Sequence, residues 1–185
     1  MAKYDFMSFG EAMVRFTPPG HDRLGQAEVL ELGIAAAELN CCVNISNLSR
    51  KLLKPQMKTA YVTKLVDAWD GDYIIKHAQM HGVDMSNVVV DPYDKIGRNG
   101  RNGKCFIEVG IGPRPSYQTY DRVGGGDSFA SGLIWNLLNG RPEQECIDFA
   151  AAYSALCHTI RNDWNLVTTE EAYDVMNGGS ARVKR

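Results

Sequence analysis

The stretch DRVGGGDSFASGLIWNLLNG, residues 121–140, decides the fold. Three consecutive glycines precede Asp127 in it, namely Gly124, Gly125 and Gly126. A helix pattern follows, because its large apolar residues fall on one face at helical spacing: Phe129, Leu133, Ile134, Leu137 and Leu138. We expect this face to be the apolar face of the helix, and Gly140 to end the helix at the C′ position.

The glycine run predicts a site for a negatively charged ligand. Glycines that open a helix let a ligand come close to the backbone and leave several N–H groups without intrahelical partners. Those groups and the positive helix end suit a phosphate or a developing anion. Asp127 lies in the first turn, where the helix dipole favours its charged form, so we expect it to be ionised at neutral pH and able to accept a proton from a substrate hydroxyl. The commoner meaning of so short a motif is a flexible turn with Asp127 as a helix cap.

Length and composition indicate a soluble globular protein. The 185 residues are enough for one domain with a core, and 44% hydrophobic and 23% charged residues are ordinary values. A net charge of −2 gives no reason to expect nucleic acid or an anionic membrane as a partner. No apolar run approaches membrane-spanning length, and the first residues have no signal-peptide pattern, so we expect a cytoplasmic protein.

Cysteine and histidine spacing predicts no metal site. The five cysteines are odd in number and contain no C-x-x-C pair, so we expect reduced thiols. His77 and His81 are four residues apart on a predicted helix, and we expect them on a solvated face.

Strand and helix patterns alternate along the first half of the chain. The predicted elements are strands at 4–10 and 11–16, a helix at 35–53, a strand at 59–65, a helix at 72–81 and a strand at 88–90. Such alternation predicts a parallel sheet with crossover helices. Two further strands are expected at 104–109 and 116–121, and helices at 143–160 and after Thr168, which forms a T-x-x-E capping box with Glu171.

DRVGGGDSFASG resembles the C-terminal signature of the ribokinase-like (PfkB) sugar kinases, D-T-x-G-A-G-D-x-F-x-x-G. The positions that match are Asp121, Gly124, Gly126, Asp127, Phe129 and Gly132. The form DRVGGGDSF is especially similar to the 2-keto-3-deoxygluconate kinases. The resemblance implies an α/β fold, a ribokinase-like three-layer parallel sheet with a small β lid. It also implies transfer of the γ-phosphate of ATP to a sugar-acid hydroxyl, with Asp127 as the base, the Gly124–Gly126 backbone as the anion hole and Mg²⁺ bridging the phosphates.

The same resemblance implies four substrate-binding residues. Asn40 ends a segment, AAAELN, that is similar to the family's G-G-A-E-A-N, which lines the sugar site, although two alanines replace the glycines. Tyr120 and Arg122 fall where these kinases place a tyrosine and an arginine facing the sugar acid, and an arginine fork can bind both carboxylate oxygens. Asp163 falls where the family has an acidic residue near the sugar hydroxyls. From the residues alone, Asn40 is a polar helix position, Arg122 is an exposed strand end and Asp163 is a solvated loop residue.

The resemblance runs in two blocks, residues 1–122 and 121–185, which are not neighbours in the family. They are fused at a shared Asp121-Arg122, which indicates an internal deletion that removes much of the nucleotide-side sheet. We therefore expect an N-terminal α/β unit with β-lid strands (1–122) and a C-terminal helical unit carrying the glycine motif (123–185), together one compact domain truncated in the middle. In the family a lid edge strand often pairs with another subunit's, which by analogy allows a homo-oligomer.

Three functions remain open from the sequence. The first is a sugar kinase that uses ATP and Mg²⁺. The second is a catalytically inactive remnant that acts, if at all, by binding sugar or a partner. The third is a nucleotide binder of other chemistry, which the glycine run favours least because it has neither G-x-G-x-x-G nor Walker A spacing.

Overall fold

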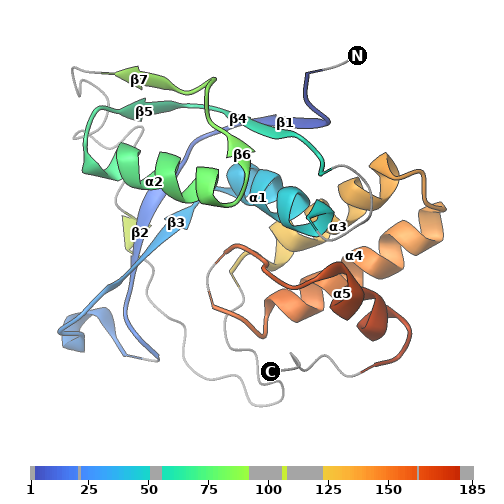
Figure 1. Ribbon diagram of the computed structural model, residues 1–185. Coiled ribbons are helices and arrows are strands. Elements are labelled where there is room, and N and C mark those ends of the chain that lie inside the picture. The colour runs from blue at the N-terminus through green and yellow to red at the C-terminus, as the bar shows by residue number, and fades with distance from the viewer. Residues whose placement is uncertain are drawn as a thin grey trace.

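The computed structural model describes residues 3–20, 22–50, 56–91, 106–107, 123–161 and 163–179. Helix α1 (Ala37–Ser49) lies between a small parallel sheet and the helices of the C-terminal part (Figure 1). The two halves of the chain therefore meet along α1, which positions the site described below.

The main sheet is parallel, as the alternating pattern predicts. Its strand order is β1 (Phe6–Phe9), β4 (Thr59–Val62), β6 (Val83–Asp84), with Phe6 in register with Thr59 and Thr59 with Val83. A second parallel pair joins β5 (Lys64–Val66) and β7 (Val89–Asp91). The segment predicted as one strand over 59–65 is thus two strands with different partners.

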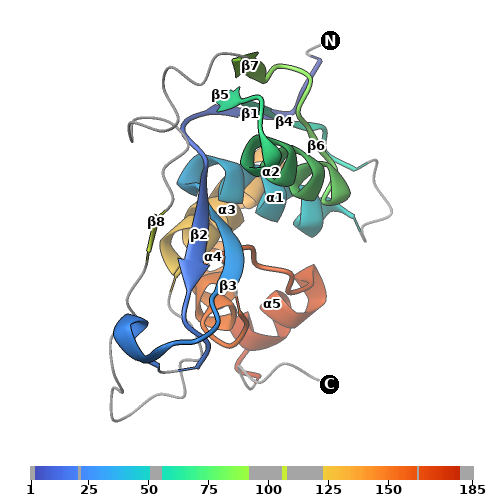
Figure 2. The ribbon, with the colours of Figure 1, turned by 90° about the vertical axis from the view of Figure 1, so that its left-hand side faces the viewer.

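A separate small sheet extends from the main body (Figure 2). In it, β2 (Met13–Thr17) pairs antiparallel with β3 (Glu31–Ala35) and parallel with β8 (Phe106–Ile107). A 3₁₀ turn at Leu24–Gln26 lies between β2 and β3. This sheet is the counterpart of the predicted lid, although β3 was not predicted, because Gly33 interrupts its short apolar pattern.

Helices α1 and α2 (Trp69–Met80) pack with the strands around a hydrophobic core, here called the first core. One stripe of α1 is mostly apolar and buried, and consists of Leu39, Cys42, Val43, Ser46 and Leu48. Helix α2 begins three residues earlier than predicted, and Gly82 follows it with φ 82°, a left-handed conformation that glycine adopts without strain.

The C-terminal part is helical. Helix α3 (Gly125–Leu138) contacts both α1 and α4 (Glu143–Cys157), and α5 (Thr169–Met176) packs on α4. The predicted capping box is confirmed, since the Thr168 side chain accepts from Glu171 N and the Glu171 carboxylate accepts from Thr168 N. Gly140 has φ 67°, as expected for the residue that ends α3. Within the described ranges, no helix is long and apolar enough to cross a membrane.

The apolar face predicted for α3 is not its buried face. Phe129, Leu137 and Leu138 are 37%, 51% and 48% exposed. The buried residues are instead mostly small or polar: Gly125, Ser128, Ser131, Gly132, Trp135 and Asn136. A Cβ atom on Gly132 would lie only 3.1 Å from the Ala150 Cα, so the α3 and α4 backbones approach closely at Gly132. Apolar periodicity cannot reveal such a face.

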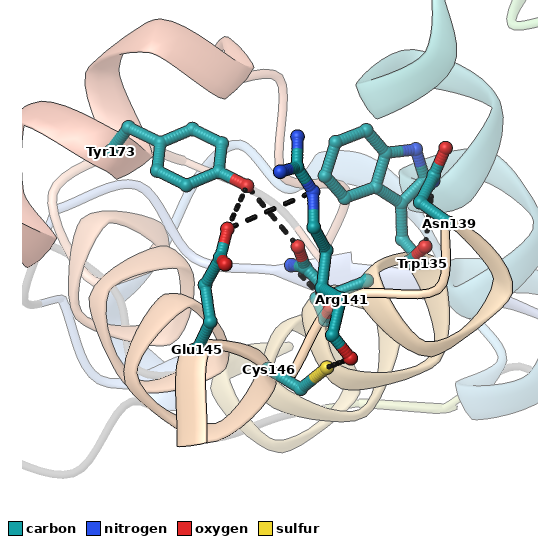
Figure 3. A network of polar contacts seen from close by, with 8 residues as sticks. Trp135, Asn139, Arg141, Glu145, Cys146 and Tyr173 are labelled. Atoms are coloured by element: carbon teal, nitrogen blue, oxygen red, sulfur yellow. Dashed lines mark hydrogen bonds and ion pairs between the residues drawn. The ribbon is translucent and has the colours of Figure 1, made fainter. Parts of the chain in front are cut away.

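Polar contacts hold the far end of α3 against α4 and α5 (Figure 3). The Tyr173 hydroxyl lies 3.0 Å from Glu145 Oε1 and 3.3 Å from Asn136 Oδ1, so its one proton can serve either acceptor. Glu145 also lies 3.7 Å from Arg141 Nε. At the end of α3, Asn139 Nδ2 donates to the Trp135 carbonyl at 2.8 Å. These contacts lie at the opposite end of α3 from the glycine run.

The close α3–α4 contact predicts opposite outcomes for two substitutions. Gly132→Val should lower the free energy of unfolding by about 1–3 kcal/mol, because the new side chain meets the α4 backbone. Leu137→Ala on the exposed face should change it by no more than about 0.5 kcal/mol. Urea unfolding of both variants measures this. If Leu137→Ala instead lowers the free energy of unfolding by about 2–5 kcal/mol, as truncation of a buried leucine does, its face must be covered.

Candidate active site

The glycine turn opens α3 with backbone donors that have no partner within the helix. Gly124 is the N-cap residue, and the first helical hydrogen bond runs from Ser128 N to its carbonyl at 2.8 Å. The N–H groups of Gly125, Gly126 and Asp127 precede that bond and so have no carbonyl acceptor within the helix. A Cβ atom on Gly126 would meet nothing within 4 Å, which leaves open space beside these donors.

Two of the three glycines are required by their surroundings. Gly124 has φ 80°, and a Cβ atom there would lie 2.5 Å from the Asp163 carbonyl oxygen. At Gly125 a Cβ atom would lie 2.3 Å from His158 Nε2. The bare turn therefore reflects close packing at Gly124 and Gly125 and open space at Gly126. Its use as an anion hole remains a prediction.

Asp127 is half-buried at the first turn of α3, beside α1. Its Oδ2 accepts a hydrogen bond of 2.7 Å from Asn40 Nδ2. Burial raises the pKa of the Asp127 carboxyl above its usual value, the hydrogen bond from Asn40 opposes that rise, and the Glu38 carboxylate adds to it. The sequence prediction considered only the helix end and missed the effect of burial.

Asn40 is brought to Asp127 by the packing of α1 on α3. It is 1% exposed, and its Oδ1 accepts a hydrogen bond of 2.9 Å from Trp164 Nε1. Both ends of the amide thus have protein partners. The predicted sugar contact of Asn40 would have to use the remaining hydrogen-bonding capacity of the group.

Asp163 is not a solvated loop residue. It is 3% exposed and forms an ion pair with Arg15 of β2, which is equally buried. Its backbone packs on Gly124, so it lies next to the glycine turn. A buried carboxylate is stable only when paired, which explains why the loop after α4 returns to β2.

Two predicted substrate-binding residues, Tyr120 and Arg122, lie outside the described residues, as does the junction at residues 121–122. Among the residues that the structure describes, no three carboxylate, imidazole or thiol side chains are grouped so as to hold a metal ion. His81, predicted on a solvated face, instead lies against the Trp164 ring, with centroids 4.8 Å apart.

Sequence reasoning missed the residues that hold the site together. Asn165 N donates to Asn44 Oδ1 at 2.8 Å, and Asn44 Nδ2 donates to Ser131 Oγ at 3.3 Å. The Ser131 hydroxyl in turn donates to the Asp127 carbonyl. One signal was present in the sequence, because Asn40 and Asn44 are one helical turn apart on a helix otherwise rich in apolar residues.

The arrangement combines a base with donors for an anion. The Asp127 carboxylate can accept a proton, and the adjacent N–H groups can stabilise negative charge at the positive end of α3. Residues 99–166 match the model of the pfkB family carbohydrate kinases. Over those residues the chain is similar to this family.

One curated relative and two solved structures are similar to this chain. A 2-dehydro-3-deoxygalactonokinase from Haloferax volcanii is 30% identical over 166 residues, which cover 85% of this chain and 45% of the relative. A 2-dehydro-3-deoxygluconokinase from Thermotoga maritima is similar with a TM-score of 0.75 and 17% identity, over 94% of this chain and 99% of the other. An aminoimidazole riboside kinase from Salmonella enterica is similar with a TM-score of 0.65 and 12% identity, over 92% of this chain and 99% of the other.

These likenesses confirm the predicted ribokinase-like fold, and identities this low in the two structures show the fold alone. The chain spans 45% of the length of the curated relative. That short span agrees with the predicted loss of a large segment.

The geometry of the glycine turn predicts different effects on stability for Gly124→Ala and Gly126→Ala. Gly124→Ala should lower the free energy of unfolding by at least about 1–2 kcal/mol, because alanine is strained at positive φ and its methyl group meets the Asp163 backbone. Gly126→Ala should be neutral or stabilising by up to about 1 kcal/mol, since it adds a helix-favouring residue in open space. Thermal unfolding of the two variants measures the difference. Equal losses would contradict the described turn.

Proposed function

We infer that the chain is a sugar kinase that transfers the γ-phosphate of ATP to a hydroxyl of 2-keto-3-deoxygluconate or a related sugar acid. The observation that carries this proposal is the Asp127 carboxylate, held by Asn40 beside the open N–H groups of the glycine turn. Similarity to the pfkB family carbohydrate kinases and the activities for which the relatives are named support it.

Asp127 is the proposed general base. Partial burial raises the pKa of its carboxyl, which brings it nearer to the operating pH and strengthens it as a proton acceptor. Asn40 occupies only Oδ2, and among the described residues Oδ1 accepts no hydrogen bond. A sugar hydroxyl can therefore donate to Oδ1 and lose its proton there as the phosphoryl group is transferred.

The residues at the start of α3 fit a phosphate. The N–H groups of Gly125 and Gly126 have no acceptor within the helix, and a methyl group on Gly126 would meet no atom within 4 Å. With the positive helix end, they would stabilise negative charge on the phosphoryl group during transfer. Mg²⁺, which would be held by the ATP phosphates, supplies charge neutralisation when bound.

The proposed sugar contacts are Asn40, Tyr120, Arg122 and Asp163. Arg122 is suited to the substrate carboxylate, and Asp163 lies beside the glycine turn but is paired with Arg15. We further propose that residues 1–122 and 123–185 act as one compact domain in the cytoplasm, and that a lid strand provides a contact for a homo-oligomer. Contacts across α1 and α3 support the single domain.

A second function follows from the length of the chain. The chain spans 45% of the curated relative. If the segment that the sequence analysis expects to be lost formed part of a nucleotide site, that site would be incomplete here. The alternative is therefore an inactive kinase remnant that binds sugar or a partner.

A coupled ATP-consumption assay with 2-keto-3-deoxygluconate and 2-keto-3-deoxygalactonate distinguishes the two functions. The kinase proposal expects Mg²⁺-dependent turnover that Asp127→Ala lowers by about 10²–10⁴-fold, because a general base is lost. Turnover should also fall with decreasing pH as the Asp127 carboxylate, the form that accepts the proton, becomes protonated. Asp72→Ala, which removes an exposed carboxylate on α2, is the matched control and should change nothing.

Absence of turnover from a folded chain would overturn the kinase proposal. Binding of either sugar acid measured by calorimetry on that same chain would then support the remnant.

A further inference from the structure

We propose that Trp164 is a positioning residue of the candidate site, whose indole N–H fixes the Asn40 amide in the orientation that donates to Asp127. The inference rests on the proposed role of Asp127 as a base. Trp164 Nε1 donates to Asn40 Oδ1 at 2.9 Å, and Asn40 Nδ2 donates to Asp127 Oδ2 at 2.7 Å. The three residues come from the loop after α4, from α1 and from α3.

The chemistry of the three groups allows only one orientation of the amide. An indole N–H can only donate, and an ionised carboxylate can only accept. If the Asn40 amide were rotated by half a turn, its NH₂ would face the indole donor and its oxygen would face the carboxylate. Both hydrogen bonds would then be replaced by repulsive contacts. Because Asn40 is 1% exposed, water cannot compensate for them.

Trp164 is itself held from several sides. Its ring packs against the first core and meets the edge of the His81 ring at 4.8 Å and 69°. The preceding residue, Asp163, pairs with Arg15 of β2. The following residue, Asn165, donates to Asn44 on α1 and through its side chain to the Tyr153 carbonyl at 2.8 Å. The indole is therefore fixed before any substrate binds.

The consequence is a defined geometry at the base. With Asn40 bound to Oδ2, the carboxylate cannot rotate freely, and Oδ1 is kept for the substrate hydroxyl. Among the residues that the structure describes, two other titratable groups lie near Asp127, both from α1. They are Glu38, whose charge raises the Asp127 pKa, and Cys41, whose thiol lies 3.8 Å from the Asp127 carbonyl.

Titration of the Asp127 carboxyl by carbon-13 NMR in the full chain tests the proposal without requiring turnover. In Trp164→Phe the ring is kept and the donor is lost, so the amide is no longer fixed and its hydrogen bond to Asp127 weakens. Since that bond lowers the Asp127 pKa, the midpoint should rise by about one pH unit. Trp69→Phe, which removes an indole that is 61% exposed, is the matched control and should leave the midpoint unchanged.

An unchanged Asp127 midpoint in folded Trp164→Phe would overturn the inference, since a merely structural residue alters stability and not this value. If Trp164→Phe does not fold, a titration of the unsubstituted chain tests the inference instead. There the Trp164 indole N–H signal should follow the Asp127 titration, the Trp69 signal should not, and Asp127→Asn should abolish the change. An indole signal of Trp164 that is independent of Asp127 would contradict the proposal.

The same experiment separates this inference from the proposed function. A shifted midpoint in a chain without turnover would support the positioning role and overturn the kinase proposal. Where turnover is present, Trp164→Phe should lower kcat and move the acidic limb of the pH profile by the same amount as the NMR midpoint.

Discussion

The buried ion pair between Arg15 and Asp163 is the constraint on which the site depends. Both side chains lie almost entirely out of water, and neither charge would be tolerated there alone. The pair draws the loop after α4 back to β2, near the start of the chain. That position places the Asp163 backbone against Gly124 and directs the next residue, Trp164, at Asn40. The Arg15–Asp163 ion pair thereby helps to determine the geometry of Asp127.

Helix α1 transmits this constraint because two of its faces are used differently. Its apolar stripe packs on the sheet, while Asn40 and Asn44, one turn apart, face α3 and the Asp163–Asn165 loop. Buried amides of this kind contribute specificity, since each needs particular partners to offset its lost hydration. The polar contacts therefore set how α1 and α3 align, and the apolar contacts supply much of the stability. A chain of half the length of its curated relative can retain such a site because the contacts that build it lie within the described parts.

Local signals in the sequence predicted local structure well. The glycine run at the start of α3, Gly140 after it and the Thr168–Glu171 capping box are each determined by a few neighbouring residues, and the structure has all of them. The buried face of α3 could not be predicted, because Ser131 and Gly132 are buried beside Trp135 while Phe129, Leu137 and Leu138 are exposed. Nor could the contact of Trp164 with Asn40, since no local rule relates residues so distant in sequence. The family resemblance named Asp127 and Asn40, and the structure added what holds them.

A double-mutant cycle on the Arg15–Asp163 pair tests the central claim most directly. The free energy of unfolding is measured for the original chain, Arg15→Met, Asp163→Asn and the double variant. If the pair joins the two halves of the chain, each single change leaves a buried charge unpaired and costs about 3–5 kcal/mol. The double variant should then cost less than the sum of the two, with a coupling of about 2 kcal/mol or more. Additive losses would show that Arg15 and Asp163 do not meet, and would contradict the account of how the site is held.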